Sequence, residues 1–229
     1  MSSSPDLTIL YYSSNFMPET SAQMFRNELY KVIGALPLIS VTQVPIDFGQ
    51  NIAVGRIGQS YYNLYYQQLL GLRQVKTKWV AFAEDDSLYT VEHFEHRPSS
   101  EEVVAYNKNF WFLDTREFWT KGHVGTFGAI SATKYVLGAL ERRYERFPEE
   151  IMPRNAQRWF WMDFGFDDRL GLPKCNTEQF STKIPLITMA HYSATYGKPR
   201  RMLRTSSATT ELPYWGNAEQ LRSKMEGKL

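Results

Sequence analysis

The stretch WVAFAEDDSLY, residues 79–89, decides the predicted fold. Its first five residues, Trp79 to Ala83, are apolar without alternation, which is typical of a short strand buried on both faces. Three carboxylates, Glu84, Asp85 and Asp86, follow at once. A buried strand cannot hold three adjacent anions in its interior. We therefore expect them at its carboxyl end, where open α/β sheets bind ligands.

The acidic triplet Glu84–Asp86 has two interpretations. Adjacent carboxylates repel one another unless a cation or hydrogen-bond donors compensate, and their hard oxygens suit Mg²⁺ or Mn²⁺. The alternative is a solvated acidic turn after a strand, which is the commoner explanation of an isolated EDD sequence. The remaining motifs of the chain favour the metal site.

Length and composition are those of a globular protein. The 229 residues suit one large domain or two small ones, 43% of them are apolar, and the net charge of +2 excludes no class of partner. Cys175 is the only cysteine, so internal disulfides and cysteine zinc sites are excluded. The first residues do not form a signal peptide, and no apolar run approaches the roughly 20 residues of a membrane span. We expect a soluble, cytoplasmic protein.

Strand and helix patterns alternate in the first part of the chain. Residues 7–12 and 37–43 are predicted strands, and residues 21–35 between them have the apolar spacing of a helix. This order favours a parallel sheet with a right-handed crossover, and so an α/β fold. The first strand breaks into Ser13, Ser14 and Asn15, small polar residues that suit a ligand or a cap.

The segment after the second strand contains a possible nucleotide contact. Asp47 lies a few residues past that strand, where an acidic side chain can meet a ribose or a base. Ser60 is the predicted N-cap of a helix over residues 61–75. The glycines before Ser60 do not have the spacing of a Walker or Rossmann fingerprint, so no phosphate loop is predicted.

The middle of the chain yields three structural predictions. Residues 103–106 and 110–113 are predicted to form a hairpin around residues 107–109. HFEH, residues 93–96, could ligate a metal from a helix, but without further support we favour a surface position for its histidines. A helix over residues 133–147 is predicted to turn Val136, Leu140 and Tyr144 inward and Glu141, Arg142 and Arg143 outward.

RWFWMDFGFDDRLG, residues 158–171, places carboxylates among aromatic rings. Rings can stack on the apolar faces of a sugar while a carboxylate receives a hydroxyl proton, and burial beside the rings would raise the pKa of that carboxylate. The alternative is that the aromatic residues belong to the core and the aspartates cap the next helix. The candidate bases are Asp163, Asp167 and Asp168.

KIPLITMAHYSATYGKPRR, residues 183–201, contains a predicted strand over residues 185–190 that ends at His191. A lone histidine is usually structural. At a strand end, in a chain with an acidic triplet, this histidine is a candidate ligand of Mg²⁺ or Mn²⁺. Lys198, Arg200 and Arg201 could neutralise a diphosphate.

This order of parts resembles the GT-A fold of nucleotide-sugar glycosyltransferases over residues 7–200. The resemblance implies one domain with a mixed, mainly parallel sheet flanked by helices. Residues 7–90 would form its nucleotide-sugar-binding half, residues 91–204 its acceptor-binding half, and residues 205–229 an extension with a helix that Asn217 caps. The matching positions are Tyr11, Tyr12, Ser13, Ser14, Asp47, the triplet Glu84 to Asp86, Asp163 or Asp167 to Asp168, and His191.

The resemblance also implies a site and a mechanism. A divalent metal on Asp86 and His191 would hold the diphosphate of a UDP-type donor, with Glu84 or Asp85 near the donor sugar. Lys198 would contribute to donor binding. Since EDD departs from a strict DxD motif, the roles within the triplet are open. An aspartate base would give a single displacement with inversion, and we favour Asp168 or Asp167 because the pair can project from the first turn of a helix.

Three acceptor and function classes remain open. PIDFGQNI and FAEDDSLY are also similar to small phage-encoded glycosyltransferases that decorate hydroxylated DNA bases, which implies a hydroxymethylated pyrimidine as acceptor and the host cytoplasm as location. KPRRMLR, residues 198–204, could contact DNA phosphates, serve the donor diphosphate or be solvated surface. The alternatives to a transferase of sugars are a nucleotidyltransferase and a non-catalytic carbohydrate- or DNA-binding module.

Overall fold

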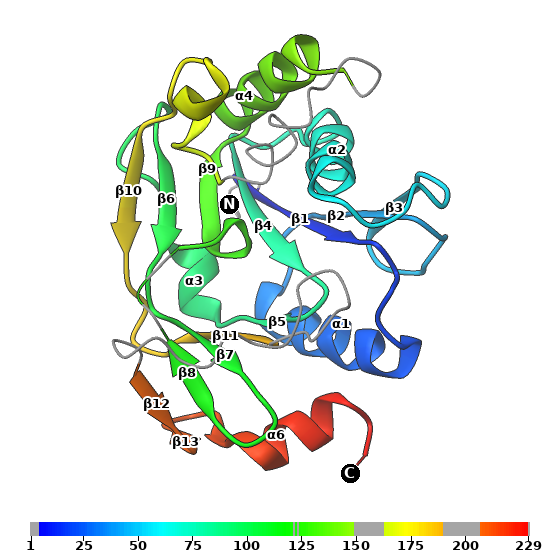
Figure 1. Cartoon of the computed structure of the whole chain (residues 1–229), viewed down its shortest axis with the longest axis vertical. Helices are drawn as coiled ribbons and strands as arrows, with labels where there is room; N and C mark the ends of the chain where they lie inside the picture. The colour runs from blue at the N-terminus through cyan, green and yellow to red at the C-terminus, as the bar shows by residue number, and fades with distance from the viewer. Residues whose placement is uncertain (1–4, 121, 123, 149–162, 190–206, 229) are drawn as a thin grey trace.

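The computed structural model describes residues 5–120, 122, 124–148, 163–189 and 207–228 (Figure 1). Its α-helices are α1 (Glu19–Ile33), α2 (Tyr61–Leu72), α3 (Val91–Glu95), α4 (Thr133–Arg146) and α6 (Ala218–Met225), and its 3₁₀ helices are η1 (Thr126–Gly128) and η3 (Asp167–Leu170). Its strands are β1 (Leu7–Ser13), β2 (Leu38–Thr42), β3 (Gln50–Ala53), β4 (Trp79–Glu84), β5 (Ser87–Leu88), β6 (Val104–Asn107), β7 (Phe110–Leu113), β8 (Phe118–Thr120), β9 (Ala129–Ala132), β10 (Thr177–Phe180), β11 (Leu186–Met189), β12 (Ser207–Thr209), β13 (Glu211–Leu212) and β14 (Gly216–Asn217).

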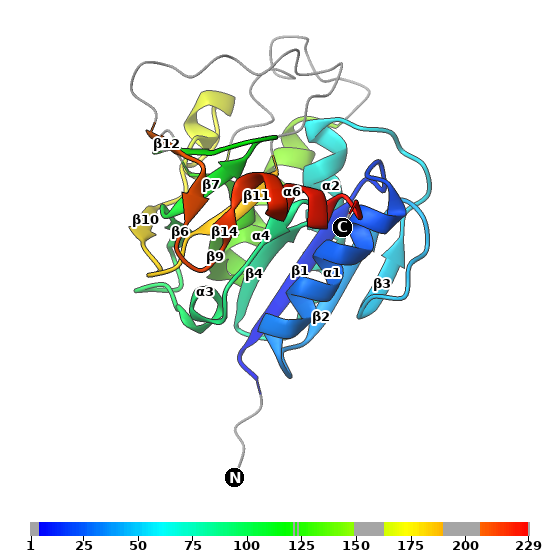
Figure 2. The same cartoon turned by 90° about the horizontal axis from the view of Figure 1, so that it is seen from below.

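Within the described residues the strands form a seven-stranded sheet, a five-stranded sheet and a small hairpin. The large sheet has the order β10-β6-β9-β4-β1-β2-β3, in which β3, β2, β1 and β4 run parallel and β9 is antiparallel to both of its neighbours. Helix α1 covers one face of its parallel part, and α2 and α4 lie on the other face (Figures 1 and 2). The predicted α/β class, a mixed and mostly parallel sheet flanked by helices, is confirmed.

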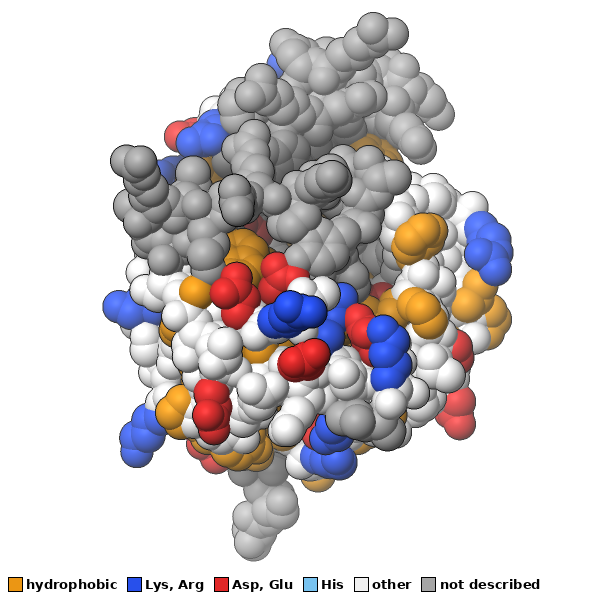
Figure 3. Space-filling model, turned by 60° about the horizontal axis from the view of Figure 1, so that its bottom comes forward, with side chains coloured by type: hydrophobic (Ala, Val, Ile, Leu, Met, Phe, Trp, Pro, Cys, Tyr) orange, Lys and Arg blue, Asp and Glu red, His pale blue; other side chains and the backbone are white. Residues whose placement is uncertain are grey.

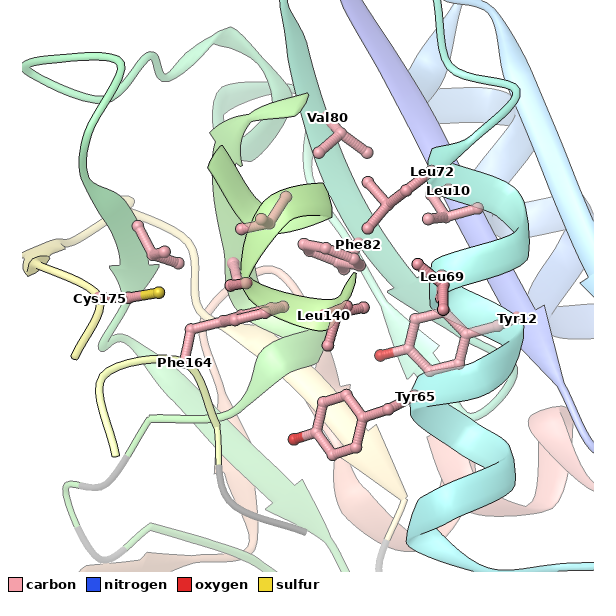
Figure 4. Packing of buried hydrophobic residues seen from close by; sticks show 14 of the residues in the cluster. Leu10, Tyr12, Tyr65, Leu69, Leu72, Val80, Phe82, Leu140, Phe164 and Cys175 are labelled. Carbon is pink, nitrogen blue, oxygen red and sulfur yellow. The ribbon is translucent and has the colours of Figure 1, made fainter. Parts of the chain in front are cut away.

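The central strands are buried on both faces because their side chains alternate between two apolar layers. Leu10 and Tyr12 of β1 pack in the layer under α2 (Figure 4). Ile9 and Tyr11 pack in the layer under α1 on the other face. Helix α2 lies so close to the sheet that a Cβ atom at Gly71 would be 2.3 Å from Leu10 Cδ1. The predicted strand from Trp79 is confirmed and extends to Glu84.

The predicted hairpin over residues 103–113 is wrong. Strand β6 belongs to the large sheet and β7 to the five-stranded sheet, β12-β8-β7-β11-β5, so the two strands do not pair with each other. Instead, β6 pairs in parallel with β10, and β7 pairs in parallel with β11. The link between β6 and β7 is held by Thr182, which lies between β10 and β11. The Asn107 amide donates to Thr182 Oγ1 (2.9 Å), and the Asn109 amide donates to the Thr182 carbonyl (2.8 Å).

Two predictions about individual side chains are also wrong. His93 is fully buried beside Phe180 and Asn107, and His96 stacks on Phe180 with ring centroids 3.7 Å apart, so HFEH is not a surface pair. Arg143 points into the core and is 0% exposed. The predicted caps are correct: Ser60 Oγ accepts from Asn63 N, and Asn217 Oδ1 accepts from the first turn of α6.

No helix in the described ranges has both the length and the apolar character that crossing a membrane requires.

Candidate functional site

The acidic triplet lies at the point where the strand order of the large sheet reverses. From β1 the chain proceeds to β2 and β3 on one side and then to β4 on the other side of β1. The carboxyl ends of β1 and β4 therefore flank a topological switch point, where open α/β sheets bind their ligands. Tyr12 pairs in register with Glu84 across this point.

The three carboxylates have different hydrogen-bond partners, because Glu84 ends β4 whereas Asp85 and Asp86 lie in the turn that follows it. Glu84 accepts a hydrogen bond from Tyr12 Oη (2.8 Å) on the α2 side. Asp85 accepts one from Ser13 Oγ. Asp86 Oδ1 accepts from Ser87 Oγ (3.0 Å) and from Thr188 Oγ1 of β11 (3.4 Å). The triplet is thus three separate anionic contacts around one strand end.

Glu84 is held in surroundings that disfavour its charge. Burial raises its pKa well above the ordinary value, and the negative charges of Asp86, Asp85 and Asp163 raise it further, against the hydrogen bond from Tyr12. Burial likewise raises the pKa of Tyr12, so this hydroxyl stays a donor. Figure 4 shows Tyr12 at the edge of the apolar layer beside Tyr65. A cation or donor-rich ligand at this edge would relieve the clustering of negative charge.

The backbone around the switch point is fixed by two side-chain amides, of which the sequence analysis identified Asn15 but not Gln67. Asn15, at a left-handed φ of 54°, accepts from Gln43 N (2.8 Å) and Val44 N (3.1 Å) and so joins the ends of β1 and β2. Gln67 of α2 donates to the carbonyls of Ser13 (2.8 Å) and Val41 (2.9 Å). The signal of Gln67 in the sequence is a polar residue where the helical pattern of α2 requires an apolar one. Ser14 accepts from Gln59 Nε2 (3.0 Å) at the exposed rim.

Asp47 is not brought to this edge. It is exposed on the loop that returns from the carboxyl end of β2 to the start of β3, which pairs with Ile39 near the amino end of β2. The carbonyl of the next residue, Phe48, accepts from Ser40 Oγ (2.7 Å), and its ring packs on Tyr11 below the sheet edge. Asp47 therefore lies apart from the triplet.

The three candidate bases have different surroundings. Asp167 is 2% exposed and accepts from Arg143 Nε (2.7 Å) and from Gly165 N (3.1 Å). Asp168 is exposed on η3. Asp163 is partly buried, where it accepts from Thr126 N (2.9 Å) and from the Thr126 hydroxyl. The prediction that Asp167 and Asp168 lie in the first turn of a helix is confirmed.

Asp163 is the candidate base that lies near the triplet. Burial raises its pKa, against the two hydrogen bonds from Thr126, and its charge in turn raises the pKa of Glu84. Helix η1, which Thr126 begins, contacts β4 directly. The Arg143 guanidinium lies 5.2 Å from the ring of Phe164, the residue after Asp163, and so fixes this turn against α4.

The predicted metal ligands are only partly within the described residues. Asp86 is described, whereas His191 and Lys198 lie outside the described ranges. Met189, two residues before His191, donates its backbone N–H to the Asp86 carbonyl (2.9 Å). The oxygen ligands of the triplet suit a hard divalent cation, but among the described residues no three His, Cys, Asp or Glu side chains converge on one point.

Comparison with known proteins identifies the fold. No protein-family model matches the chain, and no curated protein sequence matches it. Among solved structures, a glycosyltransferase involved in the glycosylation of the major capsid of PBCV-1 matches 84% of this chain and 96% of its own, with 11% identity and a TM-score of 0.51. TarS 1-349 of S. aureus in complex with UDP matches 82% of this chain and 61% of its own, with 14% identity and a TM-score of 0.49. The chain has the fold of GT-A glycosyltransferases.

Proposed function

We propose that this protein is a metal-dependent glycosyltransferase that moves a sugar from a nucleotide-diphosphate sugar, with UDP-sugar as the first candidate, to an acceptor hydroxyl. The observation that supports this most is the divergent acidic triplet at the switch point of a GT-A fold. A solvated acidic turn would not need Tyr12 and Ser13, both buried, to contact two of its carboxylates.

Donor binding is assigned to the ends of β1 and β4. Ser13 and Ser14 present hydroxyls at this edge, and Tyr12 positions Glu84, so these groups would orient the donor beside Asp85. Tyr11 lies beneath them with its hydroxyl buried, which suits a supporting role. Lys198 remains a candidate for the diphosphate, and Asp47 becomes a weaker candidate because of its position on the return loop.

Asp86 and His191 are the proposed metal ligands. Support comes from the hydrogen bond between Met189 N and the Asp86 carbonyl, because two residues span at most about 7 Å and His191 is two residues further on. A bound Mn²⁺ or Mg²⁺ would supply positive charge against the departing diphosphate. Thr188 and Ser87 would orient the Asp86 carboxylate toward the ion through their hydrogen bonds.

Among the three aspartates, we now place Asp163 first as the base. Its raised pKa and its position beside Glu84 suit a group that takes the acceptor proton, whereas Asp167 is engaged by Arg143 and Asp168 faces solvent. A single displacement with inversion would follow. The acceptor stays a prediction, including the hydroxymethylated pyrimidine, whose support is the motif similarity and the basic run over residues 198–204.

Thermal shift with nucleotides, with and without Mn²⁺, tests the proposal. UDP-glucose and UDP-N-acetylglucosamine are expected to raise the Tm in the presence of Mn²⁺, and the Asp86→Asn variant is expected to lose this shift while Glu145→Gln, on the exposed side of α4, retains it. A shift with nucleoside triphosphates alone would favour a nucleotidyltransferase. No metal-dependent shift with any nucleotide would favour a non-catalytic binding module and overturn the proposal.

Donor hydrolysis by single Asn variants of Asp163, Asp167 and Asp168 identifies the base. General-base catalysis contributes roughly 10²–10⁴-fold, so the variant of the true base is expected to lose about that much turnover while keeping its Mn²⁺-dependent donor shift. Turnover equal to that of the unmodified protein in all three variants would show that none of these aspartates is the base.

A further inference from the structure

A cavity of about 230 Å³ lies on the α1 side of the molecule, away from the candidate bases. It is a half-open hollow lined by residues of α1, β5, α6 and the turn between β13 and β14, and Figure 2 shows α6 crossing the same side of the sheet as α1. Leu88 and Met225 are among its apolar lining residues, and Glu28 and Lys224 contribute charged groups. We propose that this cavity binds a sugar ring.

The strongest sign of a function is the backbone of Tyr214. This residue has a φ of 74°, in the left-handed region that favours glycine and asparagine and disfavours bulky side chains. The residue is 67% exposed, and its ring contacts the ring of Trp215 in the same turn. Residues held in such sparsely populated backbone regions cluster at ligand sites, so this exposed aromatic residue in the turn between β13 and β14 is a candidate ligand contact.

Trp215 gives the cavity a second aromatic wall in a fixed position. Its indole N–H donates to the Pro185 carbonyl (2.8 Å), which anchors the turn to the segment before β11. The rings of Tyr214 and Trp215 lie 4.9 Å apart at 89°, so they form a corner with one exposed and one anchored face. Such faces stack on the C–H groups of a pyranose.

The charges at the cavity disfavour a cationic ligand. Glu28 Oε1 lies 3.1 Å from Lys224 Nζ and 2.9 Å from Lys31 Nζ, so this carboxylate is already paired, and Figure 3 shows Lys, Arg, Asp and Glu side chains interspersed over this side of the molecule. A free cation would have to displace a lysine from this carboxylate. A polyhydroxylated ring can instead donate to the carboxylate and accept from the ammonium group.

Size supports the same class of ligand. Pockets for drug-sized ligands have volumes of roughly 300–1,000 Å³, so about 230 Å³ suits a single ring rather than a nucleotide.

Leu88 follows Asp86 by two residues, so the cavity and the proposed transfer site share one short segment of chain. The assignment of a sugar follows from the lining and does not depend on the donor site. If the proposed function holds, the cavity would retain a saccharide acceptor.

NMR titration tests the site. N-acetylglucosamine, glucose and their β-1,4-linked dimers are added to the ¹⁵N-labelled full chain, and the indole N–H signal of Trp215 is expected to shift saturably. In Tyr214→Asn this shift is expected to disappear, while the Tm rises by about 2–4 °C because asparagine tolerates the left-handed backbone. Tyr214→Phe keeps the ring and is expected to bind within a few-fold of the unmodified chain.

Failure of this site is distinguishable from failure of the transferase proposal. Asp86→Asn is expected to lose the Mn²⁺-dependent donor shift and to keep the Trp215 response to sugars. Absence of a saturable Trp215 shift with all four sugars would overturn the inference. An unchanged sugar response in Tyr214→Asn would do the same, and a lower Tm in that variant would show that the ring stabilises the fold and remove the argument from strain.

Discussion

Two carboxylates in this protein occupy opposite electrostatic surroundings. Asp167 lies 2.7 Å from Arg143 Nε, with both side chains almost fully buried. Glu84 is held by the hydroxyl of Tyr12, and within the described part of the chain no Lys, Arg or His forms an ion pair with it. Burial disfavours the charge of Arg143, but the Asp167 carboxylate outweighs this and raises the pKa of Arg143. At Glu84, burial and neighbouring anions both disfavour the charge and raise the pKa of the carboxyl group.

The difference separates a structural site from a candidate functional one. The Arg143–Asp167 pair is complete within the protein, and it joins α4 to the turn that carries Asp163. Glu84 has no such cation within the part of the chain that the structure describes, and neighbouring anions disfavour its charge, which is a common property of sites that bind a cation or transfer a proton. Each prediction below alters one side of this comparison, and the expected effects decrease from the first to the last.

Breaking the structural pair should have the largest effect on stability. Arg143→Met retains much of the side-chain volume but leaves Asp167 buried without its cation. Removing one partner of a buried pair typically lowers the free energy of unfolding by about 3–5 kcal/mol. Urea denaturation measures this loss, and it should appear as a lower midpoint at an unchanged m-value.

A charge-free pair is the matched control. The double variant Arg143→Met/Asp167→Leu removes both charges, and it should recover most of the stability because apolar replacements of buried pairs are often neutral. A single Arg143→Met variant as stable as the unmodified protein would show that Asp167 does not depend on its partner. The contrast with Glu84 would then disappear.

His93 sharpens the comparison because it is a buried ionisable group away from the triplet. Burial lowers its pKa to about 3, so the folded protein binds this proton less well than the unfolded chain, whose histidine pKa is about 6.5. Stability should therefore fall as the pH falls below about 6.5, by about 2 kcal/mol at pH 5. His93→Phe should remove this acid sensitivity in pH-dependent urea denaturation, since Phe can keep the stack on Phe180.

The His93→Phe variant can also contradict this prediction. An equally steep acid dependence in His93→Phe would assign the sensitivity to other groups, with His96, whose pKa burial also lowers, as the next to replace. Loss of the sensitivity with unchanged Mn²⁺-dependent donor binding would show that a buried ionisable group without a charged partner is not by itself a functional site.

The parallel half of the fold could be predicted because its signals are local. Apolar runs, helical spacing and the Ser60 cap all lie within short windows, and the strand from Trp79 was located to within one residue. The hairpin over residues 103–113 was mispredicted because the partners of its two strands, β10 and β11, lie about 75 residues further on. The hydrophobic pattern of a short segment cannot reveal which distant strand will pair with it.

The site could be predicted less completely. The acidic triplet Glu84–Asp86 could be predicted because three adjacent carboxylates directly after an apolar run are easily recognised in the sequence. The prediction that Arg143 is exposed is wrong because an arginine in an amphipathic helix pattern is normally assigned to the solvent-facing side. Its counterion, Asp167, lies 24 residues away in the sequence and could not be recognised from that pattern. Gln67 and the backbone partners of Asn15 could not be predicted, because both amides bind backbone groups of distant strands, which depends on the folded arrangement alone.

Glu84 provides the final and smallest prediction. Its pKa is raised in the folded state, so its contribution to stability is complete below the unfolded pKa of about 4.3 and is lost as the pH rises above it. Glu84→Gln cannot ionise, and its side-chain oxygen can still accept from Tyr12. The variant should therefore gain stability over the unmodified protein as the pH rises from 4 to 8, and we expect a gain smaller than the effect at His93 because Glu84 keeps some exposed surface that solvent screens. Denaturation over this range, with Glu145→Gln as the exposed control, measures the gain. A variant that is less stable at pH 8 would show that the Glu84 carboxylate is compensated in the folded protein, and the two acidic sites would then be alike.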